Sequence, residues 1–335
     1  MIIILVKNFG DLLVSLRANN KLTKKDLAAF IGYTAKQLYR IEKSECIPSL
    51  DLIMQLSEFY KINLLKYYDI FIKHNSLDSF IQFSTLINAI ENANYSLVEI
   101  LYGEYEKLSS FSTGENLRLI YYAKAFCCLI NKEYNQSLDY CIKGLQYNNA
   151  EEFYVNLSSE KIYSNITYNL ISCAGSNFYF MEETEKYTTT MLTLYENITK
   201  HFFSNKYVEY LNSKFIIRFY STILNNLSNL NIEKQQYSIA LTFIEKAIKY
   251  STETETGFAI LDSFYFTKFK CQYYLKQFKD ALITLDYCLM LSITFNKKDD
   301  FHQYINSLKL SYPNLMESTR LHDILKKYNL YNLSL

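Results

Sequence analysis

Apolar residues recur at intervals of three and four along almost the entire chain, which is the spacing of helices that bury one face. From about Leu77 onward this pattern predicts helix after helix, with short polar joints between them. The chain contains only 7 Gly and 2 Pro in 335 residues, whereas turn-rich β folds use both residues heavily. We therefore expect an all-α protein, and the length suggests about two domains at ~150 residues each.

The first seventy residues predict four short helices. A first helix presents Leu12, Leu13 and Leu16 on one face, and a second opens at Thr23, which can form a capping box with Asp26. After a break at Gly32 the pattern predicts a third helix from Ala35 to about Lys43, which Thr34 caps and which turns Leu38 and Ile41 inward. A fourth helix is capped by Ser49, and its inward residues are Leu50, Ile53, Leu56 and Phe59 or Tyr60. Two short helices around a glycine-containing turn, with the small Ala28 where they cross, form a helix-turn-helix.

Positive charge is concentrated in this N-terminal region. Residues 1–43 hold eight Lys and Arg against three Asp and Glu, a net charge of +5, so the rest of the chain carries −4 of the overall +1. A small basic region joined to a mildly acidic body is the electrostatic pattern of a DNA-binding module attached to a second domain.

The motifs of this region resemble the Xre/Cro-repressor type of helix-turn-helix over roughly residues 9–70. The positions that carry the resemblance are Leu27-Ala28, Gly32-Tyr33-Thr34, Leu38, Arg40-Ile41-Glu42 and Pro48-Ser49-Leu50. Two positions depart from the pattern, since Lys24 stands where such domains often have Gln, and Ser44 where they usually have Gly. If Ser44 is left-handed, it costs roughly 1 kcal/mol relative to Gly.

The third helix is expected to enter the major groove of DNA. Its outward residues are Ala35, Lys36, Gln37, Tyr39 and Arg40. Gln37 has the groups to bind adenine through two hydrogen bonds, and Lys36 or Arg40 to bind guanine N7 and O6. The predicted phosphate contacts are Thr34, Lys24, Lys43 and Arg17. The alternative is that these side chains only form the solvated face of a helix.

An internal repeat runs through the remaining chain: an aromatic residue, two further residues, a small or apolar residue, and apolar positions four and seven beyond it. The copies are Tyr237-x-x-Ala240 with Ile244 and Ala247, Phe278-x-x-Ala281 with Leu285 and Cys288, and the weaker Tyr134-x-x-Ser137 with Cys141 and Gly144, and Tyr95-x-x-Val98 with Tyr102 and Tyr105. This resembles the second helix of a tetratricopeptide repeat. The first helices agree at Leu224, Leu227 and Ser228, at Tyr168, Ile171 and Ser172, and at Tyr121 and Ala125.

The predicted architecture is therefore an N-terminal helix-turn-helix bundle followed by an α-solenoid of tetratricopeptide-like helix hairpins. We assign residues 1–72 to DNA binding and residues 77–335 to peptide binding and dimerisation. About five helix pairs are expected between residues 77 and 300, and a terminal capping pair over residues 301–335. Stacked hairpins of this kind form a solenoid with a concave binding surface.

In this repeat family the concave surface comes from the first helix of each pair. The resemblance places Asn169, Asn225 and Asn229 on it, with Tyr122, Phe126 and Glu233 as further candidates; this set is the predicted peptide-binding face. An Asn amide both donates and accepts hydrogen bonds, so it can hold an extended peptide backbone of any sequence. The alternative is that Asn is frequent because of a low-GC genome, and that these residues face solvent.

The combination of both parts resembles the RNPP family of peptide-sensing transcription regulators, most closely its ComR, PlcR and Rgg branches. The resemblance implies a homodimer that binds a roughly palindromic operator in double-stranded DNA. It also implies quorum sensing, in which an imported signalling peptide binds the solenoid and alters DNA binding. A hypothesis that follows is that Arg40 is masked by an acidic solenoid surface until the peptide binds.

Other classes of function find less support. A protein-interaction scaffold with a non-functional helix-turn-helix is the alternative, against which Lys36, Gln37 and Arg40 argue. No phosphate loop, nucleophile motif or metal-ligand spacing is present, so we expect no enzyme, no cofactor and no metal. The seven cysteines form no CxxC pair and are expected to be reduced core residues of a cytoplasmic protein. No stretch is apolar enough for a signal peptide or membrane helix.

Overall fold

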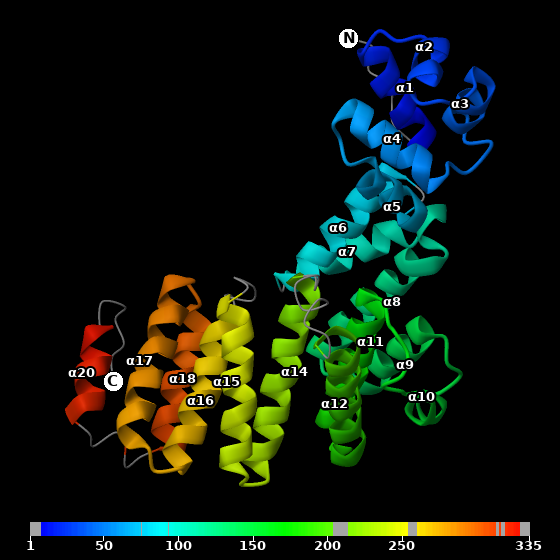
Figure 1. Ribbon diagram of the computed structural model, residues 1–335. Coiled ribbons are helices and arrows are strands. Elements are labelled where there is room, and N and C mark those ends of the chain that lie inside the picture. Colours follow the sequence, from blue (N-terminus) through cyan, green and yellow to red (C-terminus); the bar gives the residue numbers. More distant parts are fainter. Residues whose placement is uncertain are drawn as a thin grey trace. The chain divides into compact units, whose positions relative to one another are not determined.

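The computed structural model describes residues 8–74, 76–92, 94–203, 214–253, 260–312, 315 and 319–328. All regular secondary structure within these ranges is helical, which confirms the all-α prediction (Figure 1). The chain forms two compact units: Met1–Phe153 with Ile166–Met181, and Tyr154–Asn165 with Glu182–Leu335. The first unit thus joins the helix-turn-helix bundle to the first solenoid helices, and a functional boundary between residues 72 and 77 stays a prediction.

The N-terminal bundle has the predicted helices and caps. They are α1 (Phe9–Asn19), α2 (Lys24–Phe30), α3 (Ala35–Glu42), α4 (Leu50–Tyr60) and α5 (Leu64–His74). Thr23 with Asp26 and Thr34 with Gln37 form full capping boxes. Leu13, Leu27, Ala28, Leu38 and Ile41 lie in the buried cluster of this bundle. One inward assignment was wrong: Leu50 is 59% exposed, and Leu52 is buried instead.

Gly10 sets the distance at which α1 passes α3. A Cβ atom at this position would lie 2.5 Å from the carbonyl oxygen of Glu42 and 2.8 Å from that of Ile41. Both obstacles are backbone atoms, so a side chain at Gly10 cannot be accommodated by a change of rotamer. The close crossing of these two helices therefore requires glycine.

The later helices follow as predicted pairs. In the first unit they are α6 (Leu77–Glu91), α7 (Tyr95–Tyr105), the short η1 (Ser109–Phe111), α8 (Gly114–Ile130), α9 (Tyr134–Leu145), α10 (Ala150–Asn156), which crosses the division, and α11 (Asn165–Phe180). In the second they are α12 (Thr184–Ile198), the π-helical turn η2 (Thr199–Phe203), α14 (Lys214–Glu233), α15 (Tyr237–Glu253), α16 (Leu261–Tyr274), α17 (Phe278–Thr294), α18 (Lys298–Ser311) and α20 (Thr319–Lys327).

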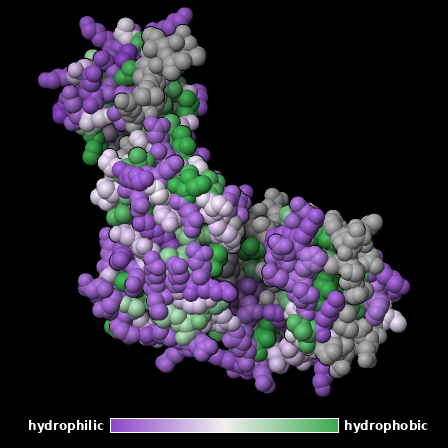
Figure 2. Space-filling view, turned by 180° about the vertical axis from the view of Figure 1, so that it is seen from behind, coloured by the Kyte–Doolittle hydropathy of each residue, from purple (hydrophilic) through white to green (hydrophobic). Residues whose placement is uncertain are grey.

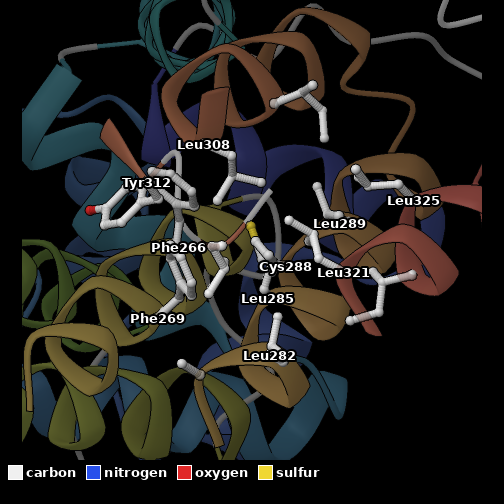
Figure 3. Packing of buried hydrophobic residues seen from close by; sticks show 14 of the residues in the cluster. Phe266, Phe269, Leu282, Leu285, Cys288, Leu289, Leu308, Tyr312, Leu321 and Leu325 are labelled. Carbon is white, nitrogen blue, oxygen red and sulfur yellow. The ribbon is translucent and has the colours of Figure 1, made fainter. Parts of the chain in front are cut away.

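The expected terminal pair corresponds to α18 and α20. Leu308 and Leu321 from these helices join Leu285 and Leu289 of α17 in one hydrophobic cluster, which Figure 3 shows from close by. Lys327 at the end of α20 also forms an ion pair with Asp286 of α17. The last described helices thus cover the apolar face of α17, as a capping pair should.

The small residues of the repeat lie where paired helices touch. Ala240, Ala247 and Ala281 are completely buried. Ser228 Oγ donates to the carbonyl oxygen of Ala240 at 2.8 Å, and Ser137 Oγ to that of Ala125 at 2.7 Å. Each of these buried hydroxyls therefore has its hydrogen-bond acceptor on the other helix of its own pair.

One repeat assignment needs correction. The number of residues between the end of the first helix and the start of the second is the same in each pair. Residues of different pairs can therefore be matched by counting back from the end of the first helix. The counterpart of Ser228 and Ala125 is then Gly175, which is buried, and not Ser172, which is only half-buried. The prediction was displaced by three residues, nearly one helical turn, because both positions lie on similar faces of α11.

The aromatic residue that opens the repeat signature connects neighbouring pairs. Tyr237 stacks on Tyr274 with ring centroids 4.7 Å apart, and Tyr134 on Phe180 at 5.2 Å. Tyr95 contacts Phe126 at 5.6 Å with the two rings tilted by 31°. Each partner lies near the end of the first helix of the following pair, so these aromatics link one repeat to the next.

Joints between paired helices contain a residue that adopts the left-handed backbone conformation although it is not glycine. Lys132, Glu182, Gln235 and Lys276 each occupy the middle of a three-residue joint, with φ between 59° and 64°. A non-glycine residue in this conformation costs roughly 1 kcal/mol or more. The low glycine content therefore reflects tolerated strain rather than an absence of tight turns.

We expect Gln235→Gly to raise the free energy of unfolding by up to about 1 kcal/mol, because glycine adopts positive φ without a Cβ penalty. Urea denaturation followed by circular dichroism would measure this. Gln236→Gly is the control, since Gln236 has no positive φ and the substitution should stabilise nothing. Equal effects at both positions would show that the joint is not strained.

Candidate nucleic-acid interface and peptide-binding face

The outward face of α3 is polar and basic. Lys36, Gln37, Arg40 and Lys43 are exposed, and Tyr39 is 42% exposed, whereas Ala35 is half-buried against the core of the bundle. Hydrophilic side chains predominate on the side of this bundle seen in Figure 2. Glu42, the acidic residue of α3, is buried, so no carboxylate of the helix opposes a DNA phosphate.

The amide of Gln37 is partly occupied. Its Oε1 accepts hydrogen bonds from the backbone N–H of Thr34 at 3.0 Å and from the Thr34 hydroxyl at 2.9 Å. Binding adenine through two hydrogen bonds needs both Oε1 and Nε2. In this arrangement only Nε2 of Gln37 is available to a base. The Thr34 hydroxyl is also engaged in the capping box, so a contact from it to a DNA phosphate would compete with that box.

Arg17 lies in a different environment from the one predicted. Its Nε and Nη2 donate to the two carboxylate oxygens of Glu42 at 2.6 and 3.0 Å, and Nη1 donates to the carbonyl oxygen of Leu22 at 3.1 Å. The hydrogen-bonded carboxylate raises the pKa of Arg17, and only 14% of the side chain is exposed. Arg17 therefore holds α1, the following turn and α3 together, and we omit it from the proposed phosphate contacts.

The remaining cations differ in how they are held. Lys24 lies over the Tyr39 ring, 4.7 Å from its centroid, with Nζ 3.8 Å from Glu42. Arg40 approaches Glu45 at 4.0 Å, and both side chains are about half exposed. Within the described residues Lys36 and Lys43 have no ion-pair partner. Lys36, Arg40 and Lys43 are thus the cations most available to DNA.

Ser44 has φ of 56°, the left-handed conformation considered from the sequence. Its hydroxyl donates to Oδ1 of Asn8 at 3.1 Å, and the same oxygen caps α1. The serine therefore gains a hydrogen bond that glycine would lack, which offsets part of its conformational cost.

The predicted peptide-binding residues fall in both units. In the first, Tyr122 and Phe126 lie on α8 with ring centroids 6.5 Å apart, and Asn169 on α11 is half-buried. Phe126 also contacts Tyr95, which gives it a structural role in joining two pairs. In the second, Asn225, Asn229 and Glu233 follow one another on α14.

Asn225 is the most distinctive member of this set. Its Oδ1 is buried and has no hydrogen-bond partner within the described residues, while its backbone carbonyl accepts from Nδ2 of Asn229 at 3.1 Å. Other Asn residues are buried within the structure: Asn177 is fully buried and donates to Ser137, although its Oδ1 also accepts no hydrogen bond from a described residue, and Asn197 donates to two backbone carbonyls. Asn content alone could not separate these two kinds.

Two residues on the equivalent face of α16, the first helix of the next pair, were not predicted from the sequence. Counting back from the ends of α14 and α16 matches Asn225 with Phe266 and Asn229 with Lys270. Lys270 Nζ lies 5.3 Å from the centroid of the Phe266 ring. The sequence does show a Lys within an aromatic-rich helix at this position, but it does not show that the Lys lies over a ring.

Other candidate chemistry is structural in the described residues. The cysteines are free and buried, apart from the half-buried Cys46, and burial raises the pKa of the Cys127 thiol to about 12 and of Cys271 to about 11. No group of three or more metal-ligating side chains occurs in the part of the chain that is described. Among the described helices, none has the length and apolar composition needed to cross a bilayer.

Residues 13–66 match the sequence model of the helix-turn-helix family, so this segment is a helix-turn-helix domain. A search of curated protein sequences gives no match to the chain. Among solved structures, it is similar to Bacillus thuringiensis PlcR in complex with the peptide PapR7 and DNA, with 14% identity, coverage of 88% of this chain and 99% of that chain, and a TM-score of 0.64.

Two further structures share the arrangement. The SHP pheromone receptor Rgg2 of Streptococcus dysgalactiae has 15% identity over 90% of this chain and 99% of that chain, with a TM-score of 0.52. ComR of S. thermophilus, in complex with DNA and its signalling peptide ComS, has 14% identity over 90% and 98%, with a TM-score of 0.50. At these identities the matches show that the chain shares the fold of these three proteins along nearly its whole length.

Proposed function

We propose that this protein is a cytoplasmic transcription regulator whose binding to an operator is controlled by a short signalling peptide on the solenoid, as in quorum sensing. One observation carries the proposal: a helix-turn-helix with an exposed basic recognition helix is followed by the fold of PlcR, which was solved with both a peptide and DNA. The ComR complex with DNA and ComS supports the same pairing of ligands.

On DNA, the N-terminal half of α3 enters the major groove. Lys36 and Arg40 read guanine, and the free Nε2 of Gln37 donates to a base acceptor. Lys43 and Lys24 neutralise phosphates and supply affinity that does not depend on sequence. A homodimer places two such helices on the half-sites of a roughly palindromic operator, where the spacing between helices matches the spacing of the half-sites.

The peptide acts by a shift of population. It binds one arrangement of the solenoid more tightly than another, and that arrangement changes how freely the two helix-turn-helix domains reach DNA. Asn225, Asn229 and Asn169 hold the peptide backbone, while Tyr122, Phe126 and Glu233 contact its side chains. Residues 77–335 therefore form the sensing and dimerising part, and residues 1–72 the DNA-binding part.

We expect Arg40→Ala to weaken operator binding roughly 5- to 150-fold, which corresponds to the loss of about 1–3 kcal/mol from one guanine contact. A gel shift on the DNA that flanks the protein's own gene, followed by selection from random duplexes, would supply the operator. Lys43→Ala should weaken all duplexes alike and reduce the salt slope by about one.

Lys73→Ala is the matched control, because Lys73 lies outside α3 and pairs with Asp69. It should leave operator binding unchanged. If the full chain and the isolated segment 1–72 both fail to bind any selected duplex, the regulator proposal is wrong and the scaffold alternative remains. Binding by the segment alone would indicate a recognition helix that the solenoid masks, as in the Arg40 hypothesis.

A further inference from the structure

Lys270 occupies a defined place on the face that we propose for peptide binding. It is the counterpart on α16 of Asn229 on α14, and these two helices pack against each other. Ser228 Oγ lies 3.9 Å from Cys271 Sγ, which fixes the register of the two helices one residue away from both positions. Lys270 and Asn229 therefore belong to one continuous face.

An aromatic ring positions this ammonium group. Lys270 Nζ lies 5.3 Å from the centroid of Phe266, and Phe266 in turn stacks on Tyr304 with centroids 4.5 Å apart. Tyr304 is held by its hydroxyl, which donates to the buried Asp262 at 3.1 Å. Tyr304 thus holds the Phe266 ring in place beneath Lys270 (Phe266 is labelled in Figure 3).

Lys270 has no acceptor in the part of the chain that is described. Among the described residues it lies over the Phe266 ring and feels the charge of Glu233, and no described carboxylate lies within ion-pair distance of it. Burial lowers its pKa, because the ammonium is partly removed from water without a hydrogen-bonded anion in return. A half-buried cation in this state gains most from an anion that arrives with a ligand.

The neighbouring first helix offers the complementary group. Asn225 Oδ1 is buried and accepts no hydrogen bond from a described residue. A peptide bound along this face can donate a backbone N–H to that oxygen and present a carboxylate to Lys270. One acceptor and one cation that lack partners among the described residues therefore match a peptide residue that carries both a backbone N–H and a carboxylate.

We propose that Lys270 and Asn225 form an anion-recognising subsite that binds a carboxylate of the signalling peptide. The inference rests on the proposed function, because it specifies the peptide that the solenoid selects. The carboxylate comes either from the C-terminus of the peptide or from an Asp or Glu side chain. Phe266 positions the ammonium group, and Asn225 aligns the peptide backbone beside it.

The test uses the full chain and a pool of short synthetic peptides of random sequence, prepared once with free C-terminal carboxylates and once amidated. Peptides retained by the protein are identified by mass spectrometry. The wild-type protein should enrich carboxylate-bearing peptides about tenfold or more over Lys270→Met, as expected for one hydrogen-bonded charge pair. Lys270→Arg should retain most of the enrichment.

Lys268→Met is the matched control. Lys268 lies on the same helix but pairs with Glu245 at 2.8 Å, so its loss should leave peptide selection unchanged. Thermal unfolding adds a second measurement: Lys270→Met should keep or raise the melting temperature, because it removes a half-buried charge that pairs with no described carboxylate. A lower melting temperature for Lys270→Met than for Lys268→Met would assign Lys270 to the structure and overturn the inference.

The remaining outcomes distinguish a failure of the subsite from a failure of the peptide-sensing function. Enrichment that disappears in the amidated pool identifies the C-terminal carboxylate, and selection of Asp or Glu within the amidated pool identifies a side chain. Peptides retained equally by wild type and Lys270→Met would overturn the subsite and leave the peptide sensor standing. If the wild-type protein retains no peptide from either pool, the peptide-controlled function is wrong, and the subsite with it.

Discussion

A Gly10→Ala substitution should destabilise the helix-turn-helix domain by about 3 kcal/mol or more, the upper range for overpacking at a tight contact. The added methyl group would lie 2.5 Å from the carbonyl oxygen of Glu42, so α1 and α3 would have to separate. Hydrogen exchange measured by mass spectrometry should show faster exchange over α1 to α4, and operator binding should be lost with it.

Gly103→Ala provides the control within the same chain. Gly103 also lies in a helix, but no heavy atom stands within 4 Å of its added Cβ. The alanine should therefore stabilise α7 by about 0.5–1 kcal/mol, the usual gain over glycine in a helix. If Gly10→Ala behaves like Gly103→Ala, the crossing of α1 and α3 does not require glycine at position 10.

Glu42→Ala should lower the free energy of unfolding of the same domain by about 3–5 kcal/mol, because it leaves a buried guanidinium without its partner. Glu42 is 2% exposed, and Arg17 donates two hydrogen bonds to it. Chemical denaturation of the purified variant measures the loss. Replacing both residues together, as Arg17→Met with Glu42→Leu, should restore much of the stability, since no charge is then buried alone.

Glu45→Ala is the comparison for an exposed pair. Its carboxylate approaches Arg40 at 4.0 Å, with both side chains about half exposed, so its removal should cost no more than ~0.5 kcal/mol. A cost for Glu42→Ala as small as that for Glu45→Ala would mean that the buried pair does not hold α1 to α3.

The sequence was sufficient for the helix-turn-helix because its signals are local. Thr23, Thr34 and Ser49 each cap the helix that follows, and these bonds depend on residues only three positions apart. The solenoid was also predictable in outline, because Ala240 and Ala281 repeat a local pattern of small residues at helix contacts. Periodicity determines which face of a helix is buried, and it does so without knowledge of distant partners.

Features that depend on distant contacts could not be derived in this way. Gly10 stands opposite backbone atoms more than thirty residues away, and Arg17 pairs with Glu42 across 25 residues. The difference between Asn177, which is fully buried, and Asn225, which is half-buried with an unsatisfied oxygen, is likewise invisible in the sequence. Composition counts residue types, whereas binding depends on which side chains the fold leaves without partners.

The capping box that joins Thr34 to Gln37 has a consequence for how such a regulator acquires new target genes. A mutation at Gln37 would alter both the proposed base contact and the start of α3, so a change of operator preference there would also change stability. Lys36 and Arg40 do not combine the two roles, since neither side chain caps the helix. Evolutionary drift of operator preference is therefore expected to proceed first through positions 36 and 40, with position 37 the slower to diverge among descendants of this chain.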